Sequence, residues 1–371
     1  MSVLKFIFAI FFFLCISYSS NAQNNLLENT AVFQIMKQGT QKMYNYDFDG
    51  AEILFNQAMI LLPKHPAPIL MKGMLIYWRN LPLVASSPKV AEMQKLLLKA
   101  EELAQAMLKI DAKNPEAIFF EMTARSLMMQ HYAKIGESSK ALSEARHIYG
   151  NVKTGMELQD KFNEFYFSSG LYNYYREKYP EVKPFYKIVS WIFQAGDKKL
   201  GLEQLVFAGK HCVISQTQAL FFLTHIYLTY EKNPFKSVEY AKELSNKFPK
   251  NRYYLCRYVE TLLLTKQYDL ANTHLQSLLK ESSVEPFTVM ISQVWAGILE
   301  EKKNKNYILA QKYYQNAIQL ATTFGIAGNH YQAYAYIGLS KIAKINKQDN
   351  IAKNYWKKAE ELAEYKYIFD Y

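Results

Sequence analysis

The chain has few cysteines and none of the short motifs that mark common catalytic or metal sites. Only three cysteines occur among its 371 residues, and it contains no CxxC pair, HExxH helix, GxSxG turn, GxxxxGK[ST] loop or GxGxxG loop. Such motifs supply metal ligands, a nucleophilic serine or a cradle for phosphate. We therefore expect no metal, no cofactor and no enzymatic activity. An enzyme remains the alternative only if tertiary structure assembles a dispersed site.

The titratable residues that could do chemistry are scattered. No two histidines share the short helical spacing that would place them on one face as metal ligands; they lie at positions 65, 131, 147, 211, 225, 274 and 330. Carboxylate pairs such as Glu101-Glu102 and Glu300-Glu301 are adjacent in sequence. Adjacent side chains diverge around a helix, so such pairs cannot share a substrate.

Long apolar runs are absent except at the N-terminus. A short basic start, an apolar run over Phe6–Tyr18 and the small residues Ser20-Asn21-Ala22 form the three parts of a secretory signal peptide. We expect residues 1–22 to be removed and a periplasmic or surface-exposed chain without a transmembrane helix to begin at Gln23. An uncleaved anchor is one alternative. Lipid attachment at Cys15 is another, although Phe13 and Leu14 stand where that motif wants small residues.

Basic residues outnumber acidic ones, 44 to 33. Removing the signal peptide deletes Lys5 alone among them. A positive balance of this kind attracts nucleic acid, acidic polymers or anionic lipid surfaces. Export argues against nucleic acid, and the lysines are scattered in short runs that usually mark solvated helix ends. Peripheral association with a membrane or the cell envelope remains an alternative.

The strongest pattern in the sequence is an apolar triplet that recurs eight times. Each triplet has a small residue, an apolar residue four positions later and another three after that, which places all three on one helical stripe. The triplets are Ala51/Phe55/Ala58, Ala100/Ala104/Met107, Ala141/Ala145/Ile148, Gly201/Leu205/Ala208, Ser237/Ala241/Leu244, Ala271/Leu275/Leu278, Ala310/Tyr314/Ala317 and Ala352/Trp356/Ala359.

The best-formed copy resembles the tetratricopeptide repeat (TPR). Gly39 precedes Ala51 by twelve residues and Pro63 follows Ala58 by five, and this arrangement is similar to the TPR unit of two antiparallel helices. The resemblance implies an all-α fold: an α-solenoid of about eight antiparallel hairpins that forms a right-handed superhelix over residues 23–371. An irregular helical bundle is the alternative. A solenoid grows without adding separate cores, so we expect a single array.

The resemblance also implies where a partner binds. In TPR proteins the first helices line the concave groove, and counting from Gly39 the expected groove residues are apolar. They are Phe33, Met36, Met43, Leu70, Met74, Tyr77, Ile291, Val294 and Ile298. Members that clamp an acidic peptide have Lys, Asn and Arg at these positions, so this chain departs from them. The groove is either an open surface for a partner or simply core.

An aromatic insertion at about 172–196 separates the third and fourth triplets. We expect Pro180 and Pro184 to interrupt the helix there and residues 185–193 to form a short helix. Tyr186, Lys187 and Trp191 would then form a recognition edge, or the segment only fills a gap in the array. The run GLYNYYREKYPEVKP looks like segments of exported bacterial TPR proteins. It is also similar to the tetratricopeptide-39-like and inclusion-body-clearance family, which implies at most a scaffold near membranes.

Cys212 and Cys256 fall in the fourth and sixth repeats, with the fifth between them. Each repeat of a solenoid touches only its neighbours, so we expect two free thiols. Together these patterns predict an exported, non-enzymatic scaffold that binds a protein or peptide through its apolar groove. The alternative is a binder of envelope glycan or lipid headgroups that uses the aromatic insertion and the basic surface.

Overall fold

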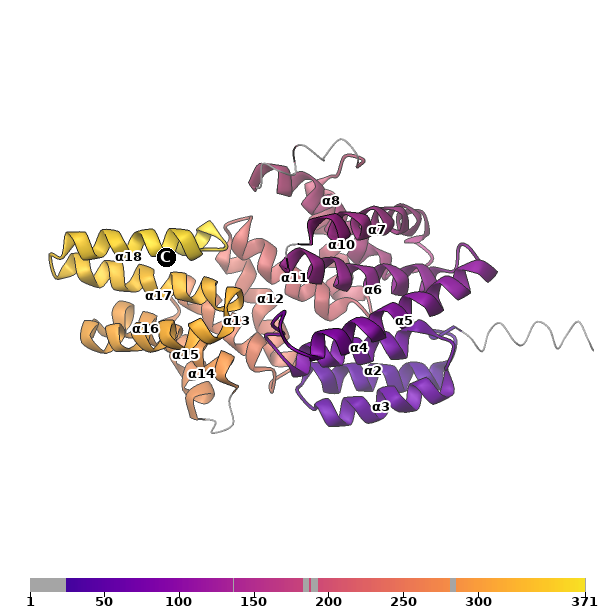
Figure 1. The fold of residues 1–371 in the computed structure, drawn as a ribbon, viewed down its shortest axis with the longest axis horizontal. Helices are drawn as coiled ribbons and strands as arrows, with labels where there is room; N and C mark the ends of the chain where they lie inside the picture. Colours follow the sequence, from indigo (N-terminus) through magenta and orange to yellow (C-terminus); the bar gives the residue numbers. More distant parts are fainter. Residues whose placement is uncertain (1–24, 136, 183–186, 188–192, 281–284, 371) are drawn as a thin grey trace, which may run out of the picture. The chain divides into compact units, whose positions relative to one another are not determined.

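The fold is built entirely from helices and the turns between them. A computed structural model describes residues 25–135, 137–182, 187, 193–280 and 285–370, and no strand occurs in these ranges (Figure 1). The expected signal peptide lies outside the described residues. The chain divides into two compact units, Met1–Tyr172 with Val189–Ala195 (unit 1) and Asn173–Ile188 with Gly196–Tyr371 (unit 2). The boundary falls inside one helix, α8 (Phe165–Val182).

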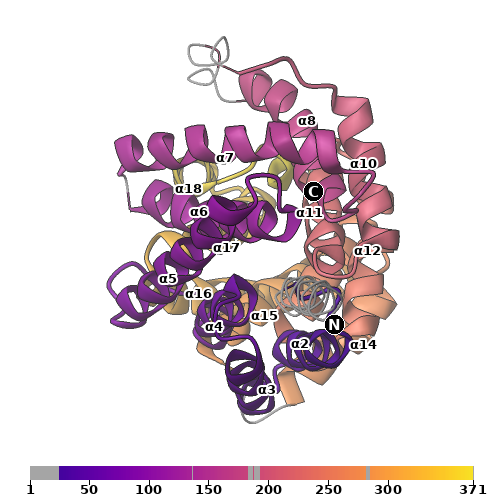
Figure 2. The same cartoon turned by 90° about the vertical axis from the view of Figure 1, so that its right-hand side faces the viewer.

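Unit 1 is a stack of helical hairpins in which each helix packs against the next (Figure 2). The first hairpin contacts the second, and the second contacts the third. The helices are α2 (Thr30–Tyr44), α3 (Phe48–Leu61), α4 (Pro66–Arg79), α5 (Lys89–Ile110), α6 (Pro115–Lys134) and α7 (Ser138–Leu158).

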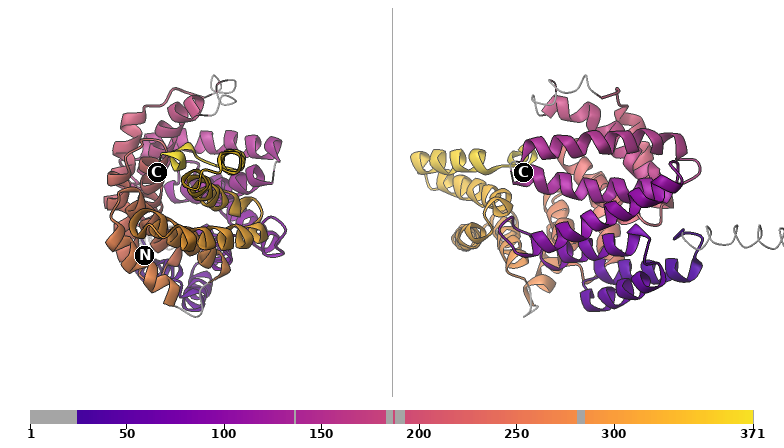
Figure 3. Two further views of the ribbon diagram at one scale, coloured as in Figure 1. Left: turned by 90° about the vertical axis from the view of Figure 1, so that its left-hand side faces the viewer. Right: turned by 45° about the vertical axis from the view of Figure 1, so that its right-hand side comes forward.

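Unit 2 continues the same plan. Hydrogen bonds from Asn173 to Gln204 (2.8 Å) and from the Lys198 backbone to Glu177 (3.1 Å) join α8 to α10. Four further hairpins follow, and the last, α17 with α18, is clear in Figure 3. The elements are α10 (Lys198–His211), α11 (Gln216–Thr229), α12 (Pro234–Lys247), α13 (Arg252–Leu264), α14 (Tyr268–Lys280), α15 (Pro286–Leu299), η2 (Glu300–Asn304), α16 (Tyr307–Ala321), η3 (Thr322–Phe324), α17 (Ile326–Ile345), α18 (Asp349–Leu362) and η4 (Lys366–Phe369).

Five of the hairpin turns share one backbone device. A non-glycine residue with positive φ follows the first helix: Tyr46, Lys232, Lys266, Lys305 or Lys347. In three of these turns the next residue caps the second helix, because Asp47, Asn233 and Asn306 accept a hydrogen bond from the backbone three residues on. In these five turns the chain reverses within two to four residues, which makes the helices antiparallel neighbours. The described helices form eight successive hairpins, and the predicted all-α solenoid of TPR-like hairpins is confirmed.

Most predicted second-helix stripes are buried as expected. All three triplet residues are buried in α3, α10, α12, α14 and α16. In α18, Ala352 and Ala359 are fully buried while Trp356 is half-buried. Trp356 lies on the last hairpin described, where no further repeat covers it.

Two triplets on the long helices are buried only in part. In α5, Ala100 and Ala104 are fully buried as predicted and Met107 is half-buried, and the same buried stripe continues back through Leu97 and Met93. In α7 the predicted Ala141/Ala145/Ile148 is half-buried, whereas Val152, Gly155 and Leu158 are buried. These helices have 22 and 21 residues, so each stripe extends beyond one triplet. Periodicity predicted the face of each helix but not which part of that face the neighbour covers.

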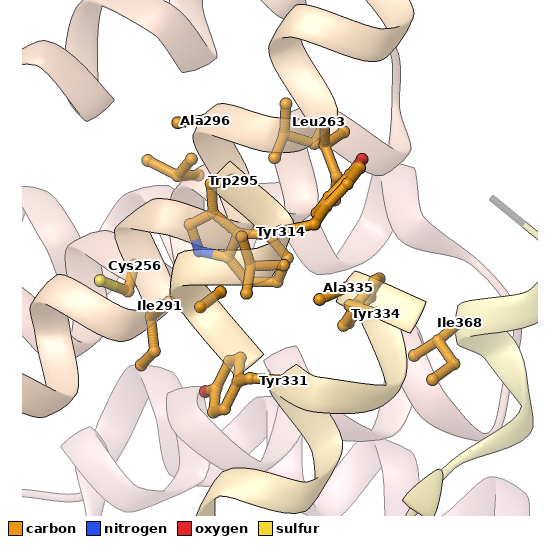
Figure 4. Packing of buried hydrophobic residues seen from close by; sticks show 14 of the residues in the cluster. Cys256, Leu263, Ile291, Trp295, Ala296, Tyr314, Tyr331, Tyr334, Ala335 and Ile368 are labelled. Carbon is orange, nitrogen blue, oxygen red and sulfur yellow. The ribbon is translucent and has the colours of Figure 1, made fainter. Parts of the chain in front are cut away.

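The core of unit 2 shows why glycine recurs in the first helices. Tyr314 of α16 is fully buried, with Gly297 of α15 and Gly338 of α17 against its ring. A Cβ at Gly297 or Gly338 would lie 2.5 Å or 2.2 Å from that ring. Close-packed interiors tolerate no such overlap. Figure 4 shows Tyr314 beside Trp295 and Leu263, within the apolar cluster that joins the last four hairpins.

The prediction that Pro180 interrupts a helix is wrong, whereas the prediction for the two cysteines is confirmed. Pro180 does not interrupt the helix, because α8 runs through it to Val182. A proline this close to a helix end removes few backbone hydrogen bonds. Pro184 and most of the predicted helix over 185–193 lie outside the described residues. Cys212 and Cys256 are both buried and neither forms a disulfide, as predicted.

Candidate functional site

The predicted groove residues are mostly core. Six of the nine are buried, with at most 6% of their surface exposed: Met36, Met43, Leu70, Ile291, Val294 and Ile298. Only Phe33, Met74 and Tyr77 keep partial exposure. In this conformation the six buried side chains cannot contact a partner, so the prediction of an open apolar groove through them needs correction.

These side chains are buried because other helices pack against the helices that carry them. α15 packs against α13, α14, α16 and α17, and most of its side chains are buried between them. α4 likewise contacts α2, α3, α5 and α6. First helices of successive hairpins therefore touch one another, and their apolar side chains meet between them. Of the predicted insertion edge, Lys187 is exposed, while Tyr186 and Trp191 lie outside the described residues.

A row of half-buried rings does lie on the first helices of unit 2. We call this row the aromatic surface; it consists of Tyr175, Tyr179, Phe222, His225, Tyr230 and Tyr365. Ring centroids are 4.6 Å apart between Tyr175 and Tyr179, 5.8 Å between Tyr175 and Tyr230, and 5.5 Å between His225 and Tyr230. Neighbouring rings at such distances form favourable edge and offset contacts.

The aromatic surface combines residues from α8, α11 and the segment after α18. Tyr175 and Tyr179 are one helical turn apart on α8, and Phe222 and His225 share one face of α11. Tyr365 comes from the end of the chain, with its ring 5.1 Å from that of His225 and 6.4 Å from that of Tyr230. Residues almost 200 positions apart thus form one continuous surface.

A buried carboxylate in unit 2 accepts hydrogen bonds from three side chains. Glu260 of α13 has no exposed surface. Its Oε1 accepts hydrogen bonds from the hydroxyls of Tyr367 (2.7 Å) and Tyr334 (3.0 Å), and its Oε2 pairs with Arg257 Nη1 at 2.6 Å. A buried charge is tolerated only when it is paired and hydrogen-bonded in this way. Glu260 therefore fixes two tyrosines and one arginine at a single point.

Two histidines lie beside this carboxylate network. Burial, and then the charge of Arg257, lower the pKa of His225 and of His330 to about 3. His330 Nε2 lies 3.3 Å from the Tyr367 hydroxyl, and His330 Nδ1 is buried with no hydrogen-bond partner in the part of the chain that the structure describes. Both imidazoles are therefore neutral at neutral pH. A neutral ring fits a site where Arg257 already supplies a positive charge.

The segment after α18 is seated on this site. Its backbone is extended at Ala363 and Tyr365. Tyr367 is 7% exposed and Ile368 is fully buried, while Phe369 packs on Trp356 with ring centroids 5.1 Å apart. Its main chain bonds only locally, from Asp370 to Tyr367 and from Ala363 to Ala359, with no backbone bond to α11, α13 or α17 among the described residues. Side chains alone therefore hold residues 365–369 in place.

Sequence reasoning missed this site. Periodicity places Arg257 and Glu260 on a helix that is otherwise apolar, and a charged pair at i, i+3 inside such a helix is the signal that could have been used. The alternation of Tyr365, Tyr367 and Phe369 was a second signal. Neither shows which distant helices these residues reach.

A different polar cluster lies in unit 1. Arg125 of α6 pairs with Glu101 (2.7 Å), Glu121 (3.2 Å) and Glu144 (2.9 Å), from α5, α6 and α7. Burial raises the pKa of Glu101, while the Arg125 charge opposes the shift. The carboxylates already surround one guanidinium, so the cluster joins three helices.

An open cleft of about 230 Å³ lies on the last hairpin. It is lined by Lys344, Ala352, Lys353, Trp356, Lys357 and Glu360. The Lys344 ammonium lies 6.0 Å from the centre of the Trp356 ring, and the Trp356 indole N–H donates to Glu360 at 2.9 Å. Three lysines against one glutamate make the cleft positively charged.

The described residues offer neither a metal site nor a membrane-crossing helix. They contain no group of three or more histidine, cysteine, aspartate or glutamate side chains placed to hold a metal ion. None of the helices in the described part of the chain combines the length and the apolar character that a membrane crossing requires.

Comparison with known proteins gives structural similarity only. No family model matches the chain, and no curated protein does. Among solved structures, human IFIT1, as a dimer with PPP-AAAA, is 14% identical over 86% of this chain and 69% of its own, with a TM-score of 0.39. A tetratricopeptide repeat protein from Parabacteroides merdae is 12% identical, with coverages of 90% and 100% and a TM-score of 0.33. The TPR domain of P58(IPK) is 13% identical, with coverages of 90% and 98% and a TM-score of 0.20. The hairpins described above, rather than these scores, define the TPR-like solenoid.

Proposed function

We propose that this protein is an exported, non-enzymatic scaffold that binds a segment of a protein partner on the aromatic surface of unit 2. The observation that carries the proposal is the continuous row of half-buried rings on first helices, with a peptide segment of the chain itself lying at one end of it. Tyrosine rings offer large contact areas at low entropic cost and dominate binding hot spots. Export is supported by the signal-peptide pattern of residues 1–22.

Two matched substitutions test the proposal. Tyr175 belongs to the aromatic surface, whereas Tyr227 lies on α11 outside that surface and stacks on Tyr240 at 5.8 Å. Both are half-buried tyrosines of unit 2. Proteins captured from envelope extract by the unaltered chain would be identified by mass spectrometry and their affinities measured with each variant. Tyr175→Ala should lower the affinity for a defined partner at least tenfold, whereas Tyr227→Ala should keep the affinity of the unaltered chain. Equal binding by both variants would contradict the proposal.

The lysine-lined cleft of α17 and α18 supports a second candidate function, binding of an anionic lipid headgroup or glycan. Positive clefts attract such groups through screened electrostatic interactions. Vesicles of phosphatidylcholine with and without phosphatidylglycerol would test it. The Lys353→Glu/Lys357→Glu chain should lose binding to the anionic vesicles that the unaltered chain retains. Absence of vesicle binding by the unaltered chain would dismiss the lipid form of this candidate.

A further inference from the structure

The last residues of the chain bind unit 2 in the way a peptide ligand would. Residues 365–369 belong to no hairpin, and their main chain makes no bond to α11, α13 or α17 among the described residues. They are recognised instead through alternate side chains, with Tyr365 on His225, Tyr367 on Glu260 and Phe369 on Trp356. Residues 366–369 form the short 3-10 helix η4, so the side chains of a turn, and not a strand ladder, hold the segment.

The chemistry of the contact favours tyrosine in particular. Glu260 is buried, and its Oε1 takes hydroxyl hydrogen bonds from Tyr334 and Tyr367. Tyr334 belongs to α17 and is part of the receptor, whereas Tyr367 is contributed by the bound segment. A phenylalanine in place of Tyr367 would fill the same space but leave the carboxylate one donor short. The position of Tyr367 therefore selects a side chain with both an aromatic ring and a hydroxyl.

The edges of the segment are accessible. Lys366 and Asp370 are exposed, and Asp370 makes an exposed ion pair with Lys232 at 3.7 Å. Exposed pairs of this kind contribute little. Four side chains thus fix the segment: Tyr365, Tyr367, Ile368 and Phe369. One of them, Tyr365, forms the end of the aromatic surface on which the proposed partner lies.

We infer that the aromatic surface without Tyr365, together with the neighbouring Glu260 carboxylate, forms a receptor for a tyrosine-bearing peptide, and that the chain's own Tyr365–Phe369 occupies this receptor in cis. The inference rests on the proposed function for its partner in trans: a protein segment of the form Tyr-x-Tyr-apolar-aromatic. Such a partner competes with residues 365–369. A chain in which residues 365–369 are released from Glu260 should therefore bind this partner more tightly.

The probe for the test is a labelled synthetic peptide of residues 364–371, EYKYIFDY, added to the full chain. Fluorescence anisotropy would compare the unaltered chain with Tyr367→Ala, which releases the cis segment from Glu260. We expect Tyr367→Ala to bind the peptide at least tenfold more tightly than the unaltered chain. A peptide with phenylalanine at the position of Tyr367 should bind about tenfold more weakly, since a hydrogen bond to a charged group is lost.

The matched control is Tyr355→Ala, because Tyr355 stacks on Tyr336 and lies outside the contacts of residues 365–369. It should bind the peptide no better than the unaltered chain. If circular dichroism shows that Tyr367→Ala does not fold, Tyr367→Phe replaces it with the same two peptides and the same expectations. Equal affinity of the loosened and unaltered chains, or equal affinity for both peptides, would overturn the inference.

Failure of the two proposals can be told apart. If the peptide binds as expected but Tyr175→Ala leaves partner capture unchanged, the receptor stands and the proposed function on the aromatic surface is wrong. If Tyr175→Ala abolishes partner capture but the peptide never binds, the aromatic surface stands and the cis-occupied receptor is wrong.

Discussion

The hydroxyl of Tyr367 donates a 2.7 Å hydrogen bond to Glu260, a residue 107 positions earlier in the chain. In a repeat array whose units contact only their neighbours, such a separation is unexpected. The same segment places Tyr365 against His225, in the first helix of another hairpin. Residues 365–369 therefore tie together α11, α13 and α17, and add a long-range restraint to an otherwise nearest-neighbour fold.

The first prediction concerns the strength of this restraint. Tyr367→Phe removes one hydrogen bond to a buried carboxylate and keeps the ring packing, so unit 2 should lose about 1 to 3 kcal/mol of stability. Hydrogen exchange of amides in α13 and α17 measures this loss. Tyr355→Phe is the control, because no hydrogen bond of the Tyr355 hydroxyl occurs within the described residues, and it should change stability by less than about 0.5 kcal/mol. An equal effect of both substitutions would show that the hydrogen bond from Tyr367 to Glu260 does not stabilise unit 2.

The second prediction concerns pH. Burial lowers the pKa of His330 to about 3, so below pH 6.5 the unfolded chain binds a proton that the folded chain does not. Stability should therefore fall as pH decreases from about 6.5 towards 3, by about 2 kcal/mol at pH 5 for this histidine. Urea unfolding followed at pH 7.5 and pH 5 measures the difference. His330→Gln should reduce the pH dependence, and an unchanged dependence would show that His330 does not contribute to it.

The third prediction concerns the close approach of helices at glycine. A Cβ at Gly297 would lie 2.5 Å from the buried ring of Tyr314, so Gly297→Ala should destabilise unit 2 by about 1 to 3 kcal/mol. A Cβ added at Gly150 of α7 would meet no atom within 4 Å, and Gly150→Ala should stabilise unit 1 by about 0.5 to 1 kcal/mol through helix propensity. Thermal melts of both variants check the opposite signs. A loss of stability in both would contradict the packing around Tyr314 and Gly150.

The fourth prediction concerns the hairpin turns. Lys266 has φ of 60°, a left-handed conformation that costs a residue with a side chain about 1 to 2 kcal/mol. Lys266→Gly should therefore raise stability by about 0.5 to 1 kcal/mol, after allowing for the greater entropy of glycine in the unfolded chain. Lys242→Gly, at an exposed position inside α12, should lower stability by about 1 kcal/mol. Chemical denaturation of the pair measures both changes.

The sequence allowed much of the fold to be predicted, because it repeats a local pattern. The stripes of α3, α10, α12, α14 and α16 follow directly from helical periodicity. The stripes of α5 and α7 extend beyond the predicted triplets, and only the neighbouring helix decides which part of each stripe is covered. The expected groove residues do lie on first helices, but Ile291, Val294 and Ile298 are buried because four neighbouring helices pack against α15.

The candidate site could not be predicted from local sequence patterns, for a different reason. Tyr175, His225, Glu260 and Tyr365 come from three helices and the end of the chain, and their proximity depends on how the hairpins stack. Periodicity assigns a residue to a face of its own helix and does not say which distant face it meets. The burial of Glu260 also depends on Tyr367, so neither residue reveals the contact alone.

The most direct test of the cis-occupied receptor is hydrogen exchange, followed by mass spectrometry, on the full Tyr367→Ala chain. If residues 365–369 occupy a receptor that joins separate hairpins, amides in α11, α13 and α17 should all exchange faster, and those of α2–α4 should be unchanged. Adding the peptide EYKYIFDY in trans should restore the protection in those three helices. Faster exchange confined to α17 and α18, with no effect of the peptide, would show that residues 365–369 only close the last hairpin and would contradict the central claim.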